Sequence, residues 1–431
     1  MTTRALVAAL ADTALDDTCK GWPSTRPVTR LGDVGALGLH PLRHDLLLPV
    51  AVLKQPALDN NARFMRAFLD ATGARIAPHG KTSMSPQLLL RQLEDGAWGI
   101  TVATVHQLQV CRRFGMPRVF LANQLVDRGA LEVVCDLLAR DPGFEVVALV
   151  DSVEGARLAA QAARARGLTR PLRLLVEVGF AGGRTGCRTR AVALEVARAV
   201  AADTALALVG VEGFEGLIHS DDVDADVRKV CAFLDEVVAV ARACAAERLF
   251  APGPVLLSAG GSAYYDLVAA RLGNSGIDGA QVLLRSGCYL THDAAVYAGA
   301  HAQIRRRLAA SHDVPGELLP ALELLAVVQS LPEPGRAILG LGKRDVGADM
   351  GLPLALAYSR GGEPPAPLAG HELVELNDQH AHLRLPEDSP LALGDVVVLG
   401  ISHPCTTFDK WRVLFTVDAG YRVTGAVRTF F

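Results

Sequence analysis

An imidazole and a thiol stand two residues apart late in the chain, at His403 and Cys405. The apolar run before them, residues 396–401, predicts a buried strand, and the two-residue repeat of a strand would point both side chains to the same side. Nitrogen and thiolate donors suit a borderline-soft metal such as zinc, so the pair is a candidate metal site. The alternative is a buried structural cysteine beside a surface histidine.

A second candidate group is Lys81, in the segment PHGKT at residues 78–82. This segment follows a short apolar stretch at residues 74–77 and precedes a helix-like pattern at residues 85–95. A lysine at the exit of a strand is placed for chemistry, because partial burial lowers the pKa of an amine and allows it to act as a Schiff-base lysine. The alternative is an ordinary solvated surface charge.

Two glycine-rich segments add polar groups at the ends of other predicted strands. Arg184 stands among glycines at residues 182–186, where a ligand can approach the backbone and the guanidinium can meet an oxyanion. Residues 258–262 lead into a predicted helix, whose N-terminal amides would suit a phosphate. The alternatives are a flexible loop with a surface arginine and a simple tight turn.

The elements that must position these groups alternate between short apolar runs and helical patterns, which is typical of parallel β/α units. Strands are expected near residues 75–78, 99–102, 119–122, 146–150, 172–178, 208–213, 255–259 and 282–285. Helices are expected at residues 85–95, 105–114, 128–139, 153–166, 189–202, 224–247, 263–272 and 293–307. Eight of each predict a TIM-type (β/α)8 barrel, in which catalytic groups sit at the carboxyl ends of the strands. The alternative is a doubly wound open sheet, but the Rossmann phosphate fingerprint is missing.

The pattern changes after about residue 310 to apolar, turn-rich segments with few helical periods. We therefore predict a barrel domain at residues 46–308 and a mainly-β domain at residues 309–431, which carries the candidate metal motif. Residues 1–45 form an N-terminal extension.

Composition limits the possible function classes. The chain has 431 residues, half of them hydrophobic, and a formal net charge of −3, so no basic surface for nucleic acid is expected. The eight cysteines are scattered at long intervals, which indicates reduced thiols rather than a disulfide framework. No apolar stretch is long enough to predict a membrane span. We expect a soluble cytoplasmic protein without membrane or nucleic-acid partners.

Taken in order, PHGKT near residue 80, the glycine-arginine element near residue 184, the GGS turn near residue 260 and HPCTT at residues 403–407 resemble the D-serine dehydratase and D-threonine aldolase family. The resemblance covers roughly residues 45–431. These relatives are pyridoxal phosphate enzymes with an alanine-racemase-like fold. The resemblance therefore implies this cofactor, a homodimer, and packing of residues 1–45 against the C-terminal domain.

The resemblance also implies roles for single residues. Lys81 would bond to the cofactor and act as the catalytic base, and Arg184 would lie beside the cofactor ring. Glu215 is a candidate partner for the pyridine nitrogen, although Phe214 departs from the tyrosine that relatives more often carry there. The residues implied at the phosphate are Gly260, Gly261, Ser262, Gly287, Cys288 and Tyr289. His79, Thr104 and Gln124 are further candidates to line the pocket.

The metal motif separates two activities within the family. Relatives with aldolase activity tend to have aspartate in place of Cys405, a hard oxygen ligand suited to manganese or magnesium. The thiol of Cys405 matches the dehydratase pattern and favours zinc, held with His403. The sequence identifies no third protein ligand, and His380 is a candidate to orient a ligand or a water.

The implied function is a zinc- and pyridoxal phosphate-dependent dehydratase that converts a small D-hydroxyamino acid, D-serine first, to a keto acid and ammonia. With D-serine the keto acid is pyruvate. One alternative is an aldolase for D-threonine or 3-hydroxy-D-aspartate that uses the same pocket, against which Cys405 argues. Another is a non-catalytic pyridoxal phosphate-binding protein, against which the additional β-domain argues.

Overall fold

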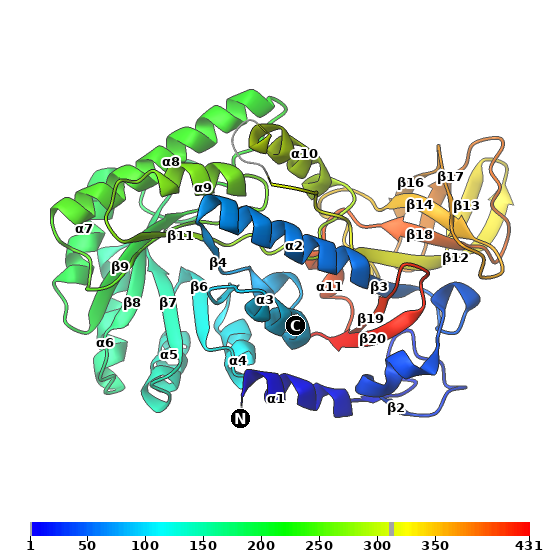
Figure 1. Cartoon of the computed structure of the whole chain (residues 1–431), viewed down its shortest axis with the longest axis horizontal. Helices are drawn as coiled ribbons and strands as arrows, with labels where there is room; N and C mark the ends of the chain where they lie inside the picture. Colours follow the sequence, from blue (N-terminus) through cyan, green and yellow to red (C-terminus); the bar gives the residue numbers. More distant parts are fainter. Residues whose placement is uncertain (1, 310–313) are drawn as a thin grey trace.

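The computed structural model describes residues 2–309 and 314–431 and has two lobes (Figure 1). One lobe is a barrel of parallel strands surrounded by helices, and the other is a mainly antiparallel β-domain formed mostly by residues 322–431. The predicted barrel with a C-terminal β-domain is confirmed. In the described part of the chain, no helix has both the length and the hydrophobicity needed to cross a membrane.

Eight parallel strands form the barrel, in the order β4-β11-β10-β9-β8-β7-β6-β5. All eight predicted strands are present: β4 (Arg75–Ile76), β5 (Ile100–Val102), β6 (Arg118–Gln124), β7 (Glu145–Val150), β8 (Leu172–Val178), β9 (Leu206–Gly213), β10 (Val255–Ala259) and β11 (Ala280–Leu284). The ends of the sheet meet through backbone hydrogen bonds, from Trp98 to the Ile76 carbonyl (2.7 Å) and from Thr101 to the Pro78 carbonyl (3.0 Å). These bonds place the segment that carries Lys81 at the seam of the barrel.

Helices follow the barrel strands as predicted: α3 (Pro86–Glu94), α4 (Val105–Arg113), α5 (Arg128–Arg140), α6 (Val153–Ala165), α7 (Arg190–Ala201), α8 (Val223–Ala246), α9 (Tyr265–Gly273) and α10 (Val296–Leu308). Five of them begin at a side chain that accepts a hydrogen bond from the first turn, namely Thr104, Asp127, Ser152, Thr189 and Asp222. Such N-caps satisfy amides that have no partner within the helix. Thr104 is therefore a helix cap.

Helix α2 (Gln55–Thr72) was not predicted. The sequence signals are present, since Pro56 lies in its first turn and Gly73 ends it with a φ of +70°. The fully buried Asn61 interrupts its apolar face, and the amide of this residue donates to the carbonyls of Leu290 (2.9 Å) and Leu319 (2.8 Å). Its carbonyl oxygen accepts from the Leu319 amide (2.7 Å). Asn61 thus ties α2 to the loop after β11 and to the segment that leads into the β-domain.

The β-domain includes one strand from before the barrel. Strand β3 (Val50–Lys54) pairs antiparallel with β12 (Leu322–Glu333) and parallel with β19 (Val413–Val417). The predicted boundary at residue 46 therefore precedes a strand of the C-terminal sheet. The remaining strands are β13 (Arg336–Leu339), β14 (Leu354–Ser359), β15 (Ala366–Pro367), β16 (Glu372–Leu376), β17 (Ala381–Arg384), β18 (Val396–Gly400) and β20 (Val423–Arg428).

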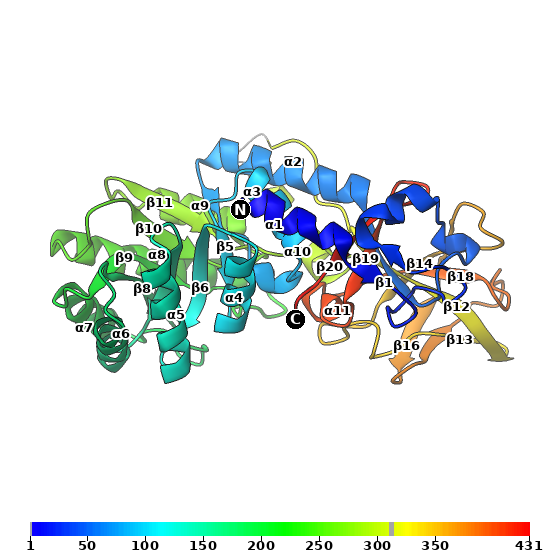
Figure 2. The same ribbon diagram turned by 90° about the horizontal axis from the view of Figure 1, so that it is seen from below.

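The N-terminal extension contacts both lobes. Its first helix, α1 (Thr3–Ala8), lies beside α3 of the barrel (Figure 2). It continues through short 3-10 turns at residues 9–12, 31–37 and 41–43 and the small hairpin of β1 (Ala14–Leu15) and β2 (Thr29–Arg30). The Leu39 carbonyl accepts a hydrogen bond from Val423, which starts β20 (2.9 Å).

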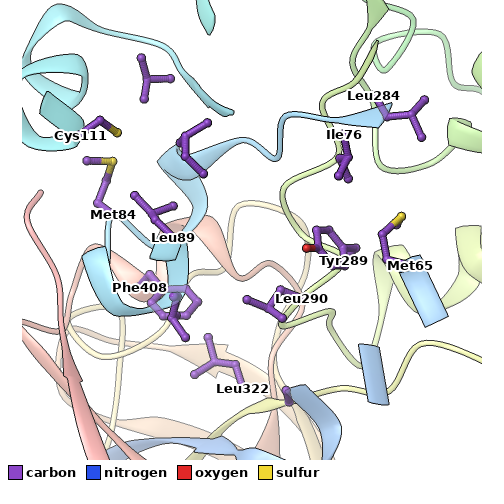
Figure 3. Close-up of a cluster of buried hydrophobic side chains, with 14 of the residues drawn as sticks. Met65, Ile76, Met84, Leu89, Cys111, Leu284, Tyr289, Leu290, Leu322 and Phe408 are labelled. Atoms are coloured by element: carbon purple, nitrogen blue, oxygen red, sulfur yellow. The ribbon is translucent and has the colours of Figure 1, made fainter. Parts of the chain in front are cut away.

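Apolar side chains and backbone hydrogen bonds join the two lobes. Phe408, from the short helix α11 (Cys405–Phe408), and Leu322 of β12 lie in one cluster with Leu89, Tyr289 and Leu290 of the barrel side (Figure 3). The joint also carries backbone hydrogen bonds from Ala294 to Ile401 (3.0 Å), from Ala321 to Thr291 (2.8 Å) and from Phe430 to Met84 (2.9 Å).

We expect Asn61→Leu to lower the free energy of unfolding by about 2–4 kcal/mol, because it leaves the buried Leu290 carbonyl and the partly buried amide and carbonyl of Leu319 without this partner. Urea unfolding followed by circular dichroism would measure this. The control is Asn60→Leu, which removes an exposed bond to the Glu317 carbonyl (2.7 Å) and should cost less than about 1 kcal/mol. Equal losses in the two variants would contradict the assigned role of Asn61.

Candidate functional site

A cavity of about 210 Å³ opens at the carboxyl ends of the barrel strands. This is the end at which barrel enzymes place their chemistry. Among the sequence candidates, the cavity brings together Lys81, Arg184, Gly260 and His79. Its other lining residues are Ala103, Ala122, Asn123, Leu149, Glu177, Thr185, Glu212, Phe214 and Arg285.

Lys81 reaches this cavity from the 3-10 turn Gly80–Thr82, directly after β4. Gly80 is required there, because a Cβ atom on it would lie 2.9 Å from the Ile100 side chain. Burial, followed by the charges of Lys81, Arg285 and Arg184, holds the pKa of His79 well below its usual value. His79 is therefore a neutral imidazole in a cavity that contains three cations.

Arg285 and Glu212 form a buried ion pair in the cavity wall, with only 3% and 1% of their surfaces exposed. The Arg285 guanidinium also donates to the Gly213 carbonyl (3.1 Å) and lies over the Phe120 ring, 5.0 Å from its centroid. Burial raises the pKa of Glu212 to about 7, against the opposing effect of Arg285. Sequence reasoning missed the pair, although charged residues at the ends of apolar strands were a signal for it.

Arg184 lies in the loop after β8, where its guanidinium stacks on Phe214, 4.6 Å from the ring centroid. The loop is held from beneath by Arg188, which donates to the carbonyls of Gly183 (2.8 Å) and Gly186 (3.0 Å). Thr185 donates to Glu177 (2.8 Å), and Gln124 donates to the same carboxylate. The exposed Arg184 is thus positioned at the cavity mouth by stacking.

Glu215 does not lie in the cavity wall. Its carboxylate is fully buried and accepts hydrogen bonds from the amides of Gly260 (3.0 Å) and Gly261 (2.6 Å). A Cβ atom on Gly261 would lie 2.5 Å from this carboxylate, so the close contact requires glycine. The structure therefore places Glu215 under the glycine turn, and the two amides predicted for a phosphate already have an acceptor.

The other predicted phosphate residues lie on an adjacent side of the barrel. Ser262, Cys288 and Tyr289 line a cavity of about 10 Å³, which has room for about one water molecule. The residue beside them, Gly287, packs on the segment that carries Lys81, since a Cβ on it would lie 2.5 Å from the His79 carbonyl. In the described chain, the amides of residues 287–289 donate to no protein acceptor, so they are free for a ligand.

His403 and Cys405 are brought together by a turn rather than by a strand. The predicted strand is present as β18, but it ends at Gly400, and Cys405 is the first residue of α11. The prediction that a strand repeat would orient His403 and Cys405 was therefore wrong. The Cys405 sulfur lies 3.4 Å from the Thr82 hydroxyl and 3.8 Å from the Cys288 sulfur. The metal motif therefore faces the residue that follows Lys81.

Asp349 orients the histidine, a role that the sequence analysis did not assign to it. The Nδ1 atom of His403 lies 2.7 Å from the Asp349 carboxylate, which also accepts from the Thr406 hydroxyl. Such a carboxylate fixes the imidazole and leaves Nε2 available as a ligand. His380, the residue predicted for this role, is instead exposed in the turn between β16 and β17.

His403 and Cys405 each shift the pKa of the other. Burial opposes protonation of His403, but Cys405 and then Asp349 raise its pKa to about 9. The hydrogen bond from Cys288, with burial opposing and His403 assisting, holds the pKa of Cys405 well below its usual value. Across residues 2–309 and 314–431, no three His, Cys, Asp or Glu side chains form a complete metal cage. The donors are a thiolate and an oriented histidine that would release its extra proton when it binds a metal, a set that fits zinc.

Comparison with known proteins agrees with this architecture. The family model "Alanine racemase, N-terminal domain" matches residues 53–268, and "Putative serine dehydratase domain" matches residues 321–417. The 3-hydroxy-D-aspartate aldolase of Paracoccus denitrificans is 29% identical over 375 residues, which are 86% of this chain and 88% of that protein. The D-threonine aldolase of an Arthrobacter species is 27% identical over 374 residues, 86% and 89% of the two chains.

Among solved structures, the D-threo-3-hydroxyaspartate dehydratase of Delftia sp. HT23 superposes with a TM-score of 0.68 at 23% identity. The match covers 89% of this chain and 98% of that chain. One solved variant of a D-threo-3-hydroxyaspartate dehydratase is described as its metal-free form. The chain belongs to the alanine-racemase-like family of fold type III pyridoxal phosphate enzymes, which includes D-threonine aldolase and 3-hydroxy-D-aspartate aldolase.

Proposed function

We propose that the protein is a pyridoxal phosphate- and zinc-dependent lyase that dehydrates D-3-hydroxyamino acids, with D-serine as the first candidate substrate. The observation that carries the proposal is the contact between the two halves of the site. Cys405 of the metal motif lies 3.4 Å from the hydroxyl of Thr82, the residue that follows Lys81. A metal held by Cys405 would therefore act beside the lysine.

The residues of the barrel mouth fit the cofactor. Lys81 is the lysine among the residues that line the cavity, and Arg184 on Phe214 offers a flat cationic wall beside it. Ser262 and the free amides of residues 287–289 are the candidates to hold the phosphate, for which the small cavity beside them would have to widen. Arg285 with Glu212 replaces Glu215 as the candidate partner of the pyridine nitrogen. When bound, the cofactor supplies an electron sink for the negative charge that develops at Cα.

The protein side chains supply the proton transfers. Lys81 would be the base that removes the Cα proton. Two carboxylates share its cavity, but Glu212 is paired with Arg285 and Glu177 accepts hydrogen bonds from Thr185 and Gln124. His403 and Cys405 would hold zinc, which as a Lewis acid assists departure of the β-hydroxyl. Loss of water gives 2-aminoacrylate, and water then converts this released product to pyruvate and ammonia.

The second candidate function is an aldolase, favoured by the names of the two relatives that align over most of the chain. In that reaction a base removes the proton of the hydroxyl and the Cα–Cβ bond breaks, which gives glycine and an aldehyde. The thiol ligand at Cys405 favours dehydration instead. We also propose a cytoplasmic homodimer; all eight cysteines are free thiols, which suits a reducing compartment.

Product analysis tests the reaction. We expect purified protein loaded with pyridoxal phosphate to form pyruvate and ammonia from D-serine, to lose at least about 90% of this activity after chelation, and to regain it with zinc. D-threonine and 3-hydroxy-D-aspartate are assayed in parallel for glycine. The matched control is L-serine, which should give no product. Glycine as the main product would assign the chain to the aldolases.

A chemical trap tests the lysine separately from the reaction. Borohydride reduction should fix pyridoxal phosphate to the peptide that contains Lys81, because only an imine is reduced to a stable link. Mass spectrometry would identify the modified residue. Lys81→Ala should abolish the label, while the control Lys343→Ala in the β-domain should keep it. A label on another lysine in the unmodified protein would show that Lys81 is the wrong residue.

A further inference from the structure

We propose that Cys288 is a third protein ligand of the metal, a role that rests on the proposed metal dependence. His403 and Cys405 supply two donors, whereas catalytic zinc sites usually have three protein ligands and one open position. The Cys288 sulfur lies 3.8 Å from the Cys405 sulfur. Two thiolates bound to one tetrahedral zinc at about 2.3 Å lie about 3.8 Å apart, so the observed separation already suits a shared ion.

The surroundings of Cys288 differ from those of the structural cysteines. In the described chain, Cys288 is buried, as Cys111 and Cys244 are, with 5% of its surface exposed, but a hydroxyl and a second thiol lie beside its sulfur. Its sulfur lies 3.9 Å from the Thr82 hydroxyl and close to Tyr297. A buried thiol among hydroxyls and a second thiol gains little from apolar packing. Ligation of a metal would account for the position of the Cys288 thiol beside Thr82 and Cys405.

The backbone at Cys288 is held in place from both sides. Gly287 packs against the His79 carbonyl and Thr82 so closely that a Cβ atom would lie 2.5 Å and 2.8 Å from them. After it, the Cys288 carbonyl accepts a hydrogen bond from His292 (2.7 Å). The cysteine is therefore presented by a rigid loop of the barrel, whereas His403 and Cys405 come from the β-domain.

The three donors do not enclose a common point in the described chain. Cys405 is nevertheless the shared neighbour, since it contacts both the Cys288 thiol and the His403 imidazole. Closing the site requires the other two side chains to turn toward each other around Cys405. The backbone amide of Cys288 remains available to the cofactor phosphate, so the thiol and the amide of one residue would serve two different ligands.

Cobalt substitution tests this without measuring activity. Sulfur-to-cobalt charge-transfer absorption increases with each bound thiolate, so full-length protein containing Co²⁺ should show the intensity of two thiolates. Cys288→Ala and Cys405→Ala should each lose about half of it, and Cys288→Ser should match Cys288→Ala. Zinc affinity, measured by competition with a chromophoric chelator, should fall by about 100-fold or more in these variants. The matched control is Cys244→Ala, which should change neither quantity.

The outcomes separate this inference from the proposed function. If Cys288→Ala and Cys288→Ser keep the wild-type cobalt spectrum and zinc affinity, Cys288 is not a ligand, while the zinc-dependent dehydratase stands. If the wild-type protein binds neither Co²⁺ nor Zn²⁺, both proposals fail. Circular dichroism and retention of the Lys81-linked cofactor in each variant would establish that a lost cobalt band reflects a lost ligand and not an unfolded chain.

Discussion

The joint between the barrel and the β-domain is the constraint on which the candidate site depends. The barrel contributes Lys81, Thr82 and Cys288, whereas the β-domain contributes His403 and Cys405. Neither lobe alone contains both the lysine and the metal motif. Apolar packing around Phe408 and backbone hydrogen bonds such as Ala294 to Ile401 fix the position of one lobe relative to the other. Because protein interiors are packed as densely as organic crystals, the two chemistries are kept within a few ångströms of each other.

The buried charged groups inside the barrel each have partners that compensate their charge. Arg285 is buried but has Glu212, a backbone carbonyl and an aromatic face as partners, so its cost of desolvation is largely offset. Glu215 is buried too, yet two amides satisfy it. Arg285 and Glu212 line the cavity together with Lys81 and Arg184, whereas Glu215 lies under the glycine turn. The cavity therefore has a positive character although each of these buried charges has a partner.

Much of the architecture could be predicted from sequence, because strand and helix periods, caps and glycines are local signals. All eight barrel strands and the helices that follow them appear near their predicted positions. Helix α2 was not predicted, although its proline and its terminal glycine are local signals. What could not be predicted is how its buried Asn61 is satisfied, because the hydrogen bonds come from residues 290 and 319. Local patterns contain no information about such distant partners.

The residues of the candidate site also differ in whether the sequence alone could predict their position. The position of Lys81 and Arg184 at the cavity could be predicted, because the end of a strand is recognisable in sequence. The pairing of Arg285 with Glu212 could not, because it depends on the register of strands far apart in the chain. Asp349 lies 54 residues before His403, so nothing local links the two. Glu215 was predicted at the cavity, but its side chain turned toward the glycine amides, a choice that only the packed loops determine.

The position of β3 has a consequence for synthesis on the ribosome. This strand emerges before the barrel, but its partners β12 and β19 begin at residues 322 and 413. At about 5–20 residues per second, β3 would wait for some tens of seconds while the entire barrel sequence is translated. During that time an apolar strand with unpaired backbone groups is exposed. The β-domain can therefore close only when translation is nearly complete.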